Sequence, residues 1–83
     1  MILYFVNGSK QKKKIIESDY GEDIIDMIID FFETHNRFPH MMQIARVESN
    51  LIIRMANSSE HFLVEDVDEE NETMITEWIN TNQ

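Results

Sequence analysis

The sequence predicts a single α+β domain over residues 1–83, with an antiparallel sheet, two helices packed on it and the element order ββαβββα. Three observations lead to this fold class. Short runs rich in Ile, Val and aromatic residues are separated by turn residues, which is typical of strands. Two longer segments repeat apolar residues at helical spacing. A chain of 83 residues is long enough for one domain with one core.

A β-hairpin is the first predicted unit. Ile2–Val6 is a β-branched and aromatic run that ends at Asn7-Gly8, a pair that tolerates the positive φ angles of a tight hairpin turn. The returning strand is expected at Lys12–Glu17. Four residues, which we call the lysine cluster, would then lie near the turn and along this strand: Lys10, Lys12, Lys13 and Lys14.

The first predicted helix follows a turn at Ser18–Gly21 and continues to about Thr34. Ser18 or Asp19 is the expected N-cap, because short polar side chains accept hydrogen bonds from the first free N–H groups of a helix. Apolar residues cover most of the helix circumference, which indicates packing against a sheet. The remaining face is wholly acidic and consists of Asp19, Asp23, Asp26, Asp30 and Glu33.

Three further strands are predicted at Met41–Glu48, Leu51–Met55 and His61–Glu65. Their connecting turns are expected at Ser49-Asn50 and Ala56–Glu60, where Asn and Ser are frequent. No segment long enough for a crossover helix separates these strands, so they should pair as an antiparallel meander. Alternating apolar residues in the second and third of them place one face of each strand on the core.

The last predicted helix begins in an acidic run, Asp66–Glu72, and carries Met74, Ile75, Trp78 and Ile79 at helical spacing. Carboxylates near a helix N-terminus interact favourably with the helix dipole, so the run is good chemistry for a helix start. Trp78 is expected to anchor this helix on the sheet.

Charge is unevenly distributed along the chain, whose formal net charge is −9. Residues 1–14 carry four Lys and no acid, whereas residues 15–83 carry sixteen acids and three Arg. Such a field repels nucleic acids and membranes and attracts basic surfaces. We therefore expect a monomer or homodimer that binds a basic protein surface, with no membrane and no direct contact to nucleic acid. In the alternative interpretation, the acidic residues serve only solubility.

Motifs for catalysis or cofactor binding are missing from the sequence. There is no Cys for a disulfide or a thiolate nucleophile, and the two Gly residues form no phosphate-binding loop. The spacing of His35, His40 and His61 matches no metal signature, which favours exposed turn histidines over a zinc site. A chain of this length also leaves little room for a deep pocket. We expect no enzymatic activity, no cofactor and no metal.

The lysine cluster has two interpretations. With Tyr4 and Phe5 it could hold a nucleic acid backbone and stack bases, although these two aromatic side chains point to opposite faces of their strand. The favoured interpretation is that Lys residues protect an exposed sheet edge from aggregation. A related alternative for the whole protein is a structural or assembly module that self-associates or pairs through its N-terminal hairpin, residues 1–17.

A further indication is a sequence pattern formed by Leu51–Met55, Asn57, Phe62–Val64, Glu69–Glu72 and Ile75. This pattern resembles the small acidic anti-CRISPR proteins of Listeria prophages, which inhibit the type II-A effector nuclease. The element order from the helix at 22–34 onward is also similar. The resemblance implies a phage protein in the cytoplasm of a bacterial host, whose carboxylates mimic DNA at the site that reads the protospacer-adjacent motif.

Together these observations predict a non-enzymatic phage or mobile-element protein that inhibits a host nucleic-acid-handling or defence factor, such as a CRISPR effector, as an acidic DNA mimic. Arg and Lys form charge-assisted pairs with carboxylates as they do with phosphates. The predicted partner-binding residues are carboxylates of the first helix, the tip of the turn before the last strand and the run at 65–72. They are Asp23, Asp26, Asp30, Glu33, Glu60, Glu65, Asp66, Asp68, Glu69, Glu70 and Glu72.

Overall fold

The structure, a computed structural model, describes residues 1–35, 41–55 and 59–82. Within these residues the secondary structure confirms the predicted α+β fold and the order ββαβββα. The elements are β1 (Ile2–Val6), β2 (Lys12–Glu17), α1 (Gly21–Thr34), β3 (Met42–Val47), β4 (Asn50–Met55), β5 (His61–Glu65) and α2 (Glu69–Thr81).

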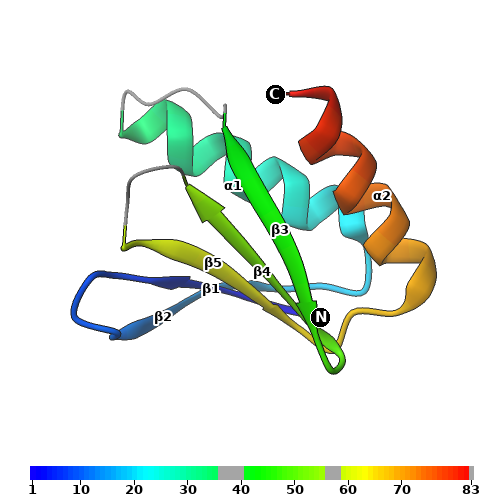
Figure 1. The fold of residues 1–83 in the computed structure, drawn as a ribbon, viewed down its shortest axis with the longest axis horizontal. Coiled ribbons are helices and arrows are strands. Elements are labelled where there is room, and N and C mark those ends of the chain that lie inside the picture. The colour runs from blue at the N-terminus through cyan, green and yellow to red at the C-terminus, as the bar shows by residue number, and fades with distance from the viewer. Residues whose placement is uncertain (36–40, 56–58, 83) are drawn as a thin grey trace.

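The described strands form one antiparallel sheet in the order β2-β1-β5-β4-β3. The pairing of β1 with β5, which sets Leu3 opposite Val64, joins the N-terminal hairpin to the predicted meander of β3, β4 and β5. Both α1 and α2 lie on the same side of the sheet (Figure 1). The molecule therefore has a helix layer, which we define as α1 and α2, and a sheet layer.

The hydrophobic core of the described residues lies between these layers. As the alternation predicted, every second residue of β4 and β5 is buried, and the buried residues of each helix recur every fourth position on one face. These core residues are Leu51, Ile53 and Met55 of β4, Phe62 and Val64 of β5, Ile24, Ile28 and Phe32 of α1, and Ile75 and Ile79 of α2.

The turn between β1 and β2 differs from the expected Asn-Gly hairpin. Gly8 does not have a positive φ, and the residue in the left-handed region is Lys10, with φ 63°. The Asn7 side chain shapes the loop, because its Oδ1 accepts hydrogen bonds from the N–H groups of Ser9 and Gln11 at 2.9 and 3.1 Å. A side-chain turn of this kind replaces the backbone geometry of the tight hairpin.

The start of α1 also differs from the prediction, since the N-cap is Tyr20 and neither Ser18 nor Asp19 caps the helix. The Gly21 N–H donates to Oδ1 of Asn71 in α2 at 2.9 Å, and Nδ2 of Asn71 donates to the carbonyl of Asp19 at 3.2 Å. A side chain of the other helix therefore satisfies a free N–H that the local sequence was expected to satisfy.

The prediction for α2 was correct at its start and wrong about its anchor. The side chain of Asp68 is the N-cap and accepts a hydrogen bond from the N–H of Asn71 at 2.8 Å. Ile75 and Ile79 are 0% and 1% exposed and dock the helix, whereas Trp78 is only partly buried beside the core.

The remaining turns are partly described. The β3–β4 turn lies at Glu48 and Ser49, one residue earlier than predicted, and Asn50 already belongs to β4. Residues 56–58 of the predicted turn between β4 and β5 lie outside the described residues. In the described part of the chain, neither helix has the length and apolar character needed to cross a membrane.

Candidate functional site

The negative charge of the chain is concentrated in the helix layer. α1 contains five Asp and Glu residues, α2 contains four, and neither helix contains Lys or Arg. All other residues together carry seven acids and all seven Lys and Arg of the chain, so they are formally neutral. The contrast between residues 1–14 and 15–83 that is visible in the sequence thus becomes a contrast between two layers of the fold.

On α1, the predicted acidic face has two kinds of carboxylate. Asp26, Asp30 and Glu33 are exposed and make no hydrogen bond or ion pair in the part of the chain that the structure describes. Asp23 is partly buried, and its Oδ2 accepts a hydrogen bond from Ser18 Oγ at 2.5 Å. Asp23 therefore helps to hold the turn before α1, while the other three are available to a partner.

The acidic run at the start of α2 is divided in the same way. Asp68 caps the helix, and Glu72 forms an ion pair with Arg46 of β3. Glu69 and Glu70 are exposed and have no ion-pair partner among residues 1–35, 41–55 and 59–82. Since Asn71 joins the starts of α1 and α2, these two carboxylates lie at the end of the helix layer where both helices begin.

The other predicted partner-binding residues belong to the sheet layer. Glu60 directly precedes β5, and Asp66 directly follows it, so they lie at opposite ends of that strand. Glu65 is the last residue of β5 and pairs with Lys12 of β2 at 3.5 Å. The structure therefore does not bring these three carboxylates together with those of the helix layer.

Of the three histidines considered for a zinc site, two lie among the described residues. His35 follows α1 and His61 begins β5, while His40 lies outside the described residues. His35 is held in place by a 2.8 Å hydrogen bond between its Nδ1 and the carbonyl of Phe31. Among the described residues, no group of three or more His, Asp or Glu side chains is arranged to hold a metal ion.

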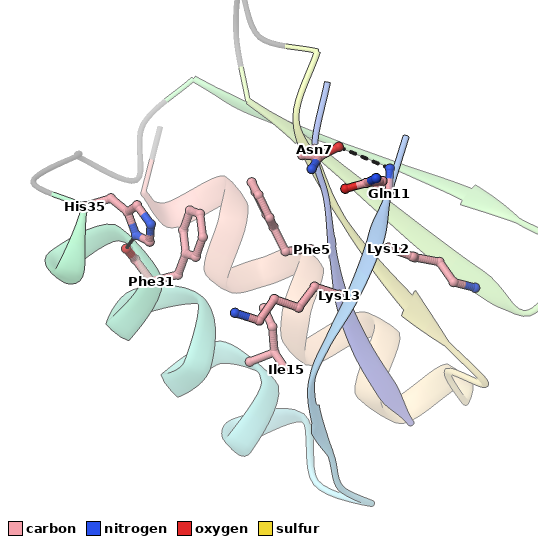
Figure 2. A pocket seen from close by; sticks show the side chains of 8 residues that line it. All are labelled: Phe5, Asn7, Gln11, Lys12, Lys13, Ile15, Phe31 and His35. Atoms are coloured by element: carbon pink, nitrogen blue, oxygen red, sulfur yellow. Dashed lines mark hydrogen bonds between the residues drawn. The ribbon is translucent and has the colours of Figure 1, made fainter. Parts of the chain in front are cut away.

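The lysine cluster is divided between the two sides of β2. Lys12 and Lys14 pair with Glu65 and Glu17 at 3.5 and 3.0 Å, and the Lys12 ammonium also lies 4.4 Å from the centre of the Tyr4 ring. Lys13 has no ion-pair partner in the described part of the chain. Figure 2 shows Lys12 directed away from α1 and Lys13 directed toward it.

β2 is one of the two outer strands of the described sheet and lies next to β1. It carries three consecutive Lys residues and a break in register opposite Leu3 and Tyr4, where the strand bulges. Lysines and bulges are the two features by which proteins discourage pairing at an exposed edge. These observations support the interpretation of the lysine cluster as edge protection.

A pocket of about 450 Å³ lies between β2 and α1 (Figure 2). This volume falls in the range of about 300–1,000 Å³ that is usual for ligand pockets, although the chain length argued against such a space. The sequence places Phe5 and Lys13 on adjacent strands, but it does not show that α1 passes beside them. The lining residues are Phe5, Asn7, Gln11, Lys12, Lys13, Ile15, Phe31 and His35.

Comparison of the chain with protein-family models, curated proteins and solved structures finds no match. The functional argument therefore depends on two features of this molecule, the acidic helix layer and the pocket beside β2.

Proposed function

We propose that this chain is a non-enzymatic binding protein whose helix layer docks on a basic surface of a nucleic-acid-handling protein. The partner class is a host or defence factor such as a CRISPR effector, and the protein inhibits it by occupying its phosphate-binding surface. The observation that carries this proposal is the separation of charge, in which α1 and α2 hold nine carboxylates and no Lys or Arg.

Several charges on α1 oppose the stability of the helix. Glu22, Asp26 and Asp30 follow one another at intervals of four residues, and like charges at this spacing repel by roughly 0.2–0.5 kcal/mol per pair. Glu33 lies in the last turn, where the helix dipole disfavours an anion and where α1 has no basic residue. Arg and Lys side chains of a partner would relieve this repulsion.

The proposed contact set is smaller than the set predicted from the sequence. Asp23, Asp68, Glu65 and Glu72 already have hydrogen-bond or ion-pair partners within the fold. Exposed carboxylates remain on both helices, and charged pairs with Arg or Lys form with these groups as with phosphates. The proposed contact residues are Asp26, Asp30, Glu33, Glu69 and Glu70.

An affinity pull-down tests the proposal with two variants that change the net charge equally. Asp26→Asn/Asp30→Asn removes two carboxylates of the helix layer, and the control Glu48→Gln/Asp66→Asn removes two exposed carboxylates of the sheet layer. From a lysate of a low-G+C Gram-positive bacterium, the unmodified protein and the control should retain one nucleic-acid-binding protein. The helix variant should lose it, and competitor DNA should release it.

Simultaneous binding of DNA and this protein by the partner would contradict the DNA-mimic proposal. If the captured partner holds DNA and this protein in one complex, the helix layer does not occupy the phosphate-binding surface. Equal loss of the partner in both variants would show that binding depends on the net charge of the protein and not on the helix layer.

The alternative of assembly through the N-terminal hairpin is less favoured. β2 is one of the two outer strands of the described sheet, as this alternative requires. Its three Lys residues and its bulge oppose the pairing of a further strand.

A further inference from the structure

The pocket beside β2 differs from the helix layer in both charge and polarity. Three of its lining residues, Phe5, Ile15 and Phe31, are partly buried and pack against the core. A second depression of about 270 Å³ shares Lys13, Ile15, Phe31 and His35 with it. Its other lining residues are Lys14 of β2 and Met27, Asp30 and Thr34 of α1. The two form one groove along β2, which runs from the hairpin loop toward the middle of α1.

We propose that this groove binds a small aromatic carboxylate, independently of the proposed function of the helix layer. Its aromatic body would lie against Phe5 and Phe31, and its carboxylate would face Lys13. This assignment follows from three properties of the groove: a rigid aromatic wall, one unpaired ammonium and a gradient of charge along its length.

The aromatic wall is held in place before any ligand arrives. The rings of Phe5 and Phe31 are 4.5 Å apart, and Phe31 also meets the buried Phe62 edge-on at 5.1 Å. His35 stacks on Phe31 at 4.1 Å and is fixed by its hydrogen bond to the Phe31 carbonyl. Because these rings need no rearrangement, a planar ligand would lose little free energy to ordering the site.

Lys13 supplies the positive charge. It lies opposite Phe5 in the strand register and extends toward α1, into the space between Ile15 and Phe31 (Figure 2). Its neighbours Lys12 and Lys14 are paired with carboxylates, whereas Lys13 has no ion pair among the described residues. Lys12 and Lys14 also line the groove, but of the three only Lys13 lacks a carboxylate partner among the described residues. One unpaired ammonium beside an apolar wall matches a ligand with one anionic group and an apolar body.

The charge gradient orients the ligand. At the loop end, the side-chain amides of Asn7 and Gln11 line the groove, and neither amide nitrogen donates a hydrogen bond in the described part of the chain. At the other end, Asp30 lines the groove and would repel an anion. The carboxylate should therefore lie between Lys13 and the two amides.

Naphthoate is a suitable probe, with naphthylmethanol as its uncharged counterpart. At about 0.3 kcal/mol per non-hydrogen atom, a ligand of this size should bind with a dissociation constant on the order of 1 mM. Amide chemical-shift titration of the full chain by NMR gives both the affinity and the location. The saturable shifts are expected at the C-terminal half of α1, at Phe5 and along β2.

Removing a positive or a negative charge from the groove distinguishes specific binding of naphthoate from nonspecific electrostatic attraction. Lys13→Gln should weaken naphthoate binding about fivefold, because a charge-assisted contact at a partly exposed site is lost. Asp30→Asn should tighten it about twofold, since a nearby repulsion is removed. The matched controls Lys10→Gln and Asp66→Asn change the same charges outside the groove and should leave the affinity unchanged.

Three results with naphthoate, and a fourth with naphthylmethanol, would overturn the assignment. The first three are the absence of saturable shifts up to the solubility limit, shifts centred elsewhere than the groove, and equal weakening by Lys10→Gln and Lys13→Gln. Naphthylmethanol that binds as tightly as naphthoate would show that the groove recognises no anion. None of these outcomes depends on whether the helix layer binds a protein.

Discussion

The helix layer and the N-terminal hairpin share a core but manage their charges in opposite ways. In the hairpin, Lys12 and Lys14 each meet a carboxylate of the sheet layer. In the helix layer, Glu72 is the only carboxylate that forms an ion pair within the described residues, and its partner is Arg46. The comparison separates charges that the fold itself uses from charges that it leaves to solvent or to a partner. The exposure of a charged side chain does not by itself show which of these two roles it has.

The largest loss of stability is expected when the core that both regions share is disrupted. Phe62 is 0% exposed, and its ring lies 5.7 Å from Phe5 of the hairpin and 5.1 Å from Phe31 of α1. Phe62→Ala should lower the free energy of unfolding by about 3–5 kcal/mol, because a large buried ring leaves a cavity. Urea denaturation followed by circular dichroism measures this loss. A loss below about 1 kcal/mol would mean that the two regions are stabilised separately.

A smaller loss of stability is expected where a side chain of α2 caps the start of α1. Asn71→Ala removes the acceptor for the Gly21 N–H and the donor to the Asp19 carbonyl. The loss of a cap should lower the free energy of unfolding by about 1 kcal/mol. Asn80→Ala, at an exposed position of the same helix, is the matched control and should have little effect. Equal unfolding midpoints of the two variants in urea would contradict the role of Asn71 as a cap in trans.

The smallest expected effect sharpens the contrast in charge. Asp26→Asn/Asp30→Asn should raise the free energy of unfolding by roughly 0.4–1 kcal/mol at low salt, because the two repulsive pairs Glu22–Asp26 and Asp26–Asp30 are removed while Asp and Asn have similar helix propensities. Added salt should reduce this gain by screening. Thermal unfolding at two salt concentrations measures both effects. A destabilised variant would show that these carboxylates support the fold.

Local patterns predicted most element boundaries correctly. The bounds of β1, β2 and β5 agree with the prediction, and α1 ends at Thr34 as expected. Each of these depends on residues that are close in sequence, such as the alternation that buries Phe62 and Val64. At Gly8, a hydrogen-bonded Asn7 side chain within the same loop replaced the expected backbone turn. At Tyr20, the side chain of Asn71, which is distant in the sequence, replaced the expected local cap.

For the candidate site, the sequence revealed which carboxylates exist but not which remain available. Asp23 and Asp26 appear equivalent on a helical projection, yet one accepts a hydrogen bond from Ser18 and the other is exposed. Lys12 and Lys13 are neighbours in the lysine cluster, yet of these two only Lys13 extends toward α1. Such differences arise from the pairing partners of each element, which a single-chain pattern does not contain.

The sequence by itself determined the fold class, the strands, the helices and the excess of acid in both helices, since each follows from composition and short-range periodicity. Only the tertiary structure decided that β1 pairs with β5, that α1 and α2 cover the same face, and that a pocket remains between β2 and α1. The physical reason is that strand order and helix placement depend on contacts between residues far apart in the chain. Many arrangements satisfy the same local pattern, and packing of one common core selects among them.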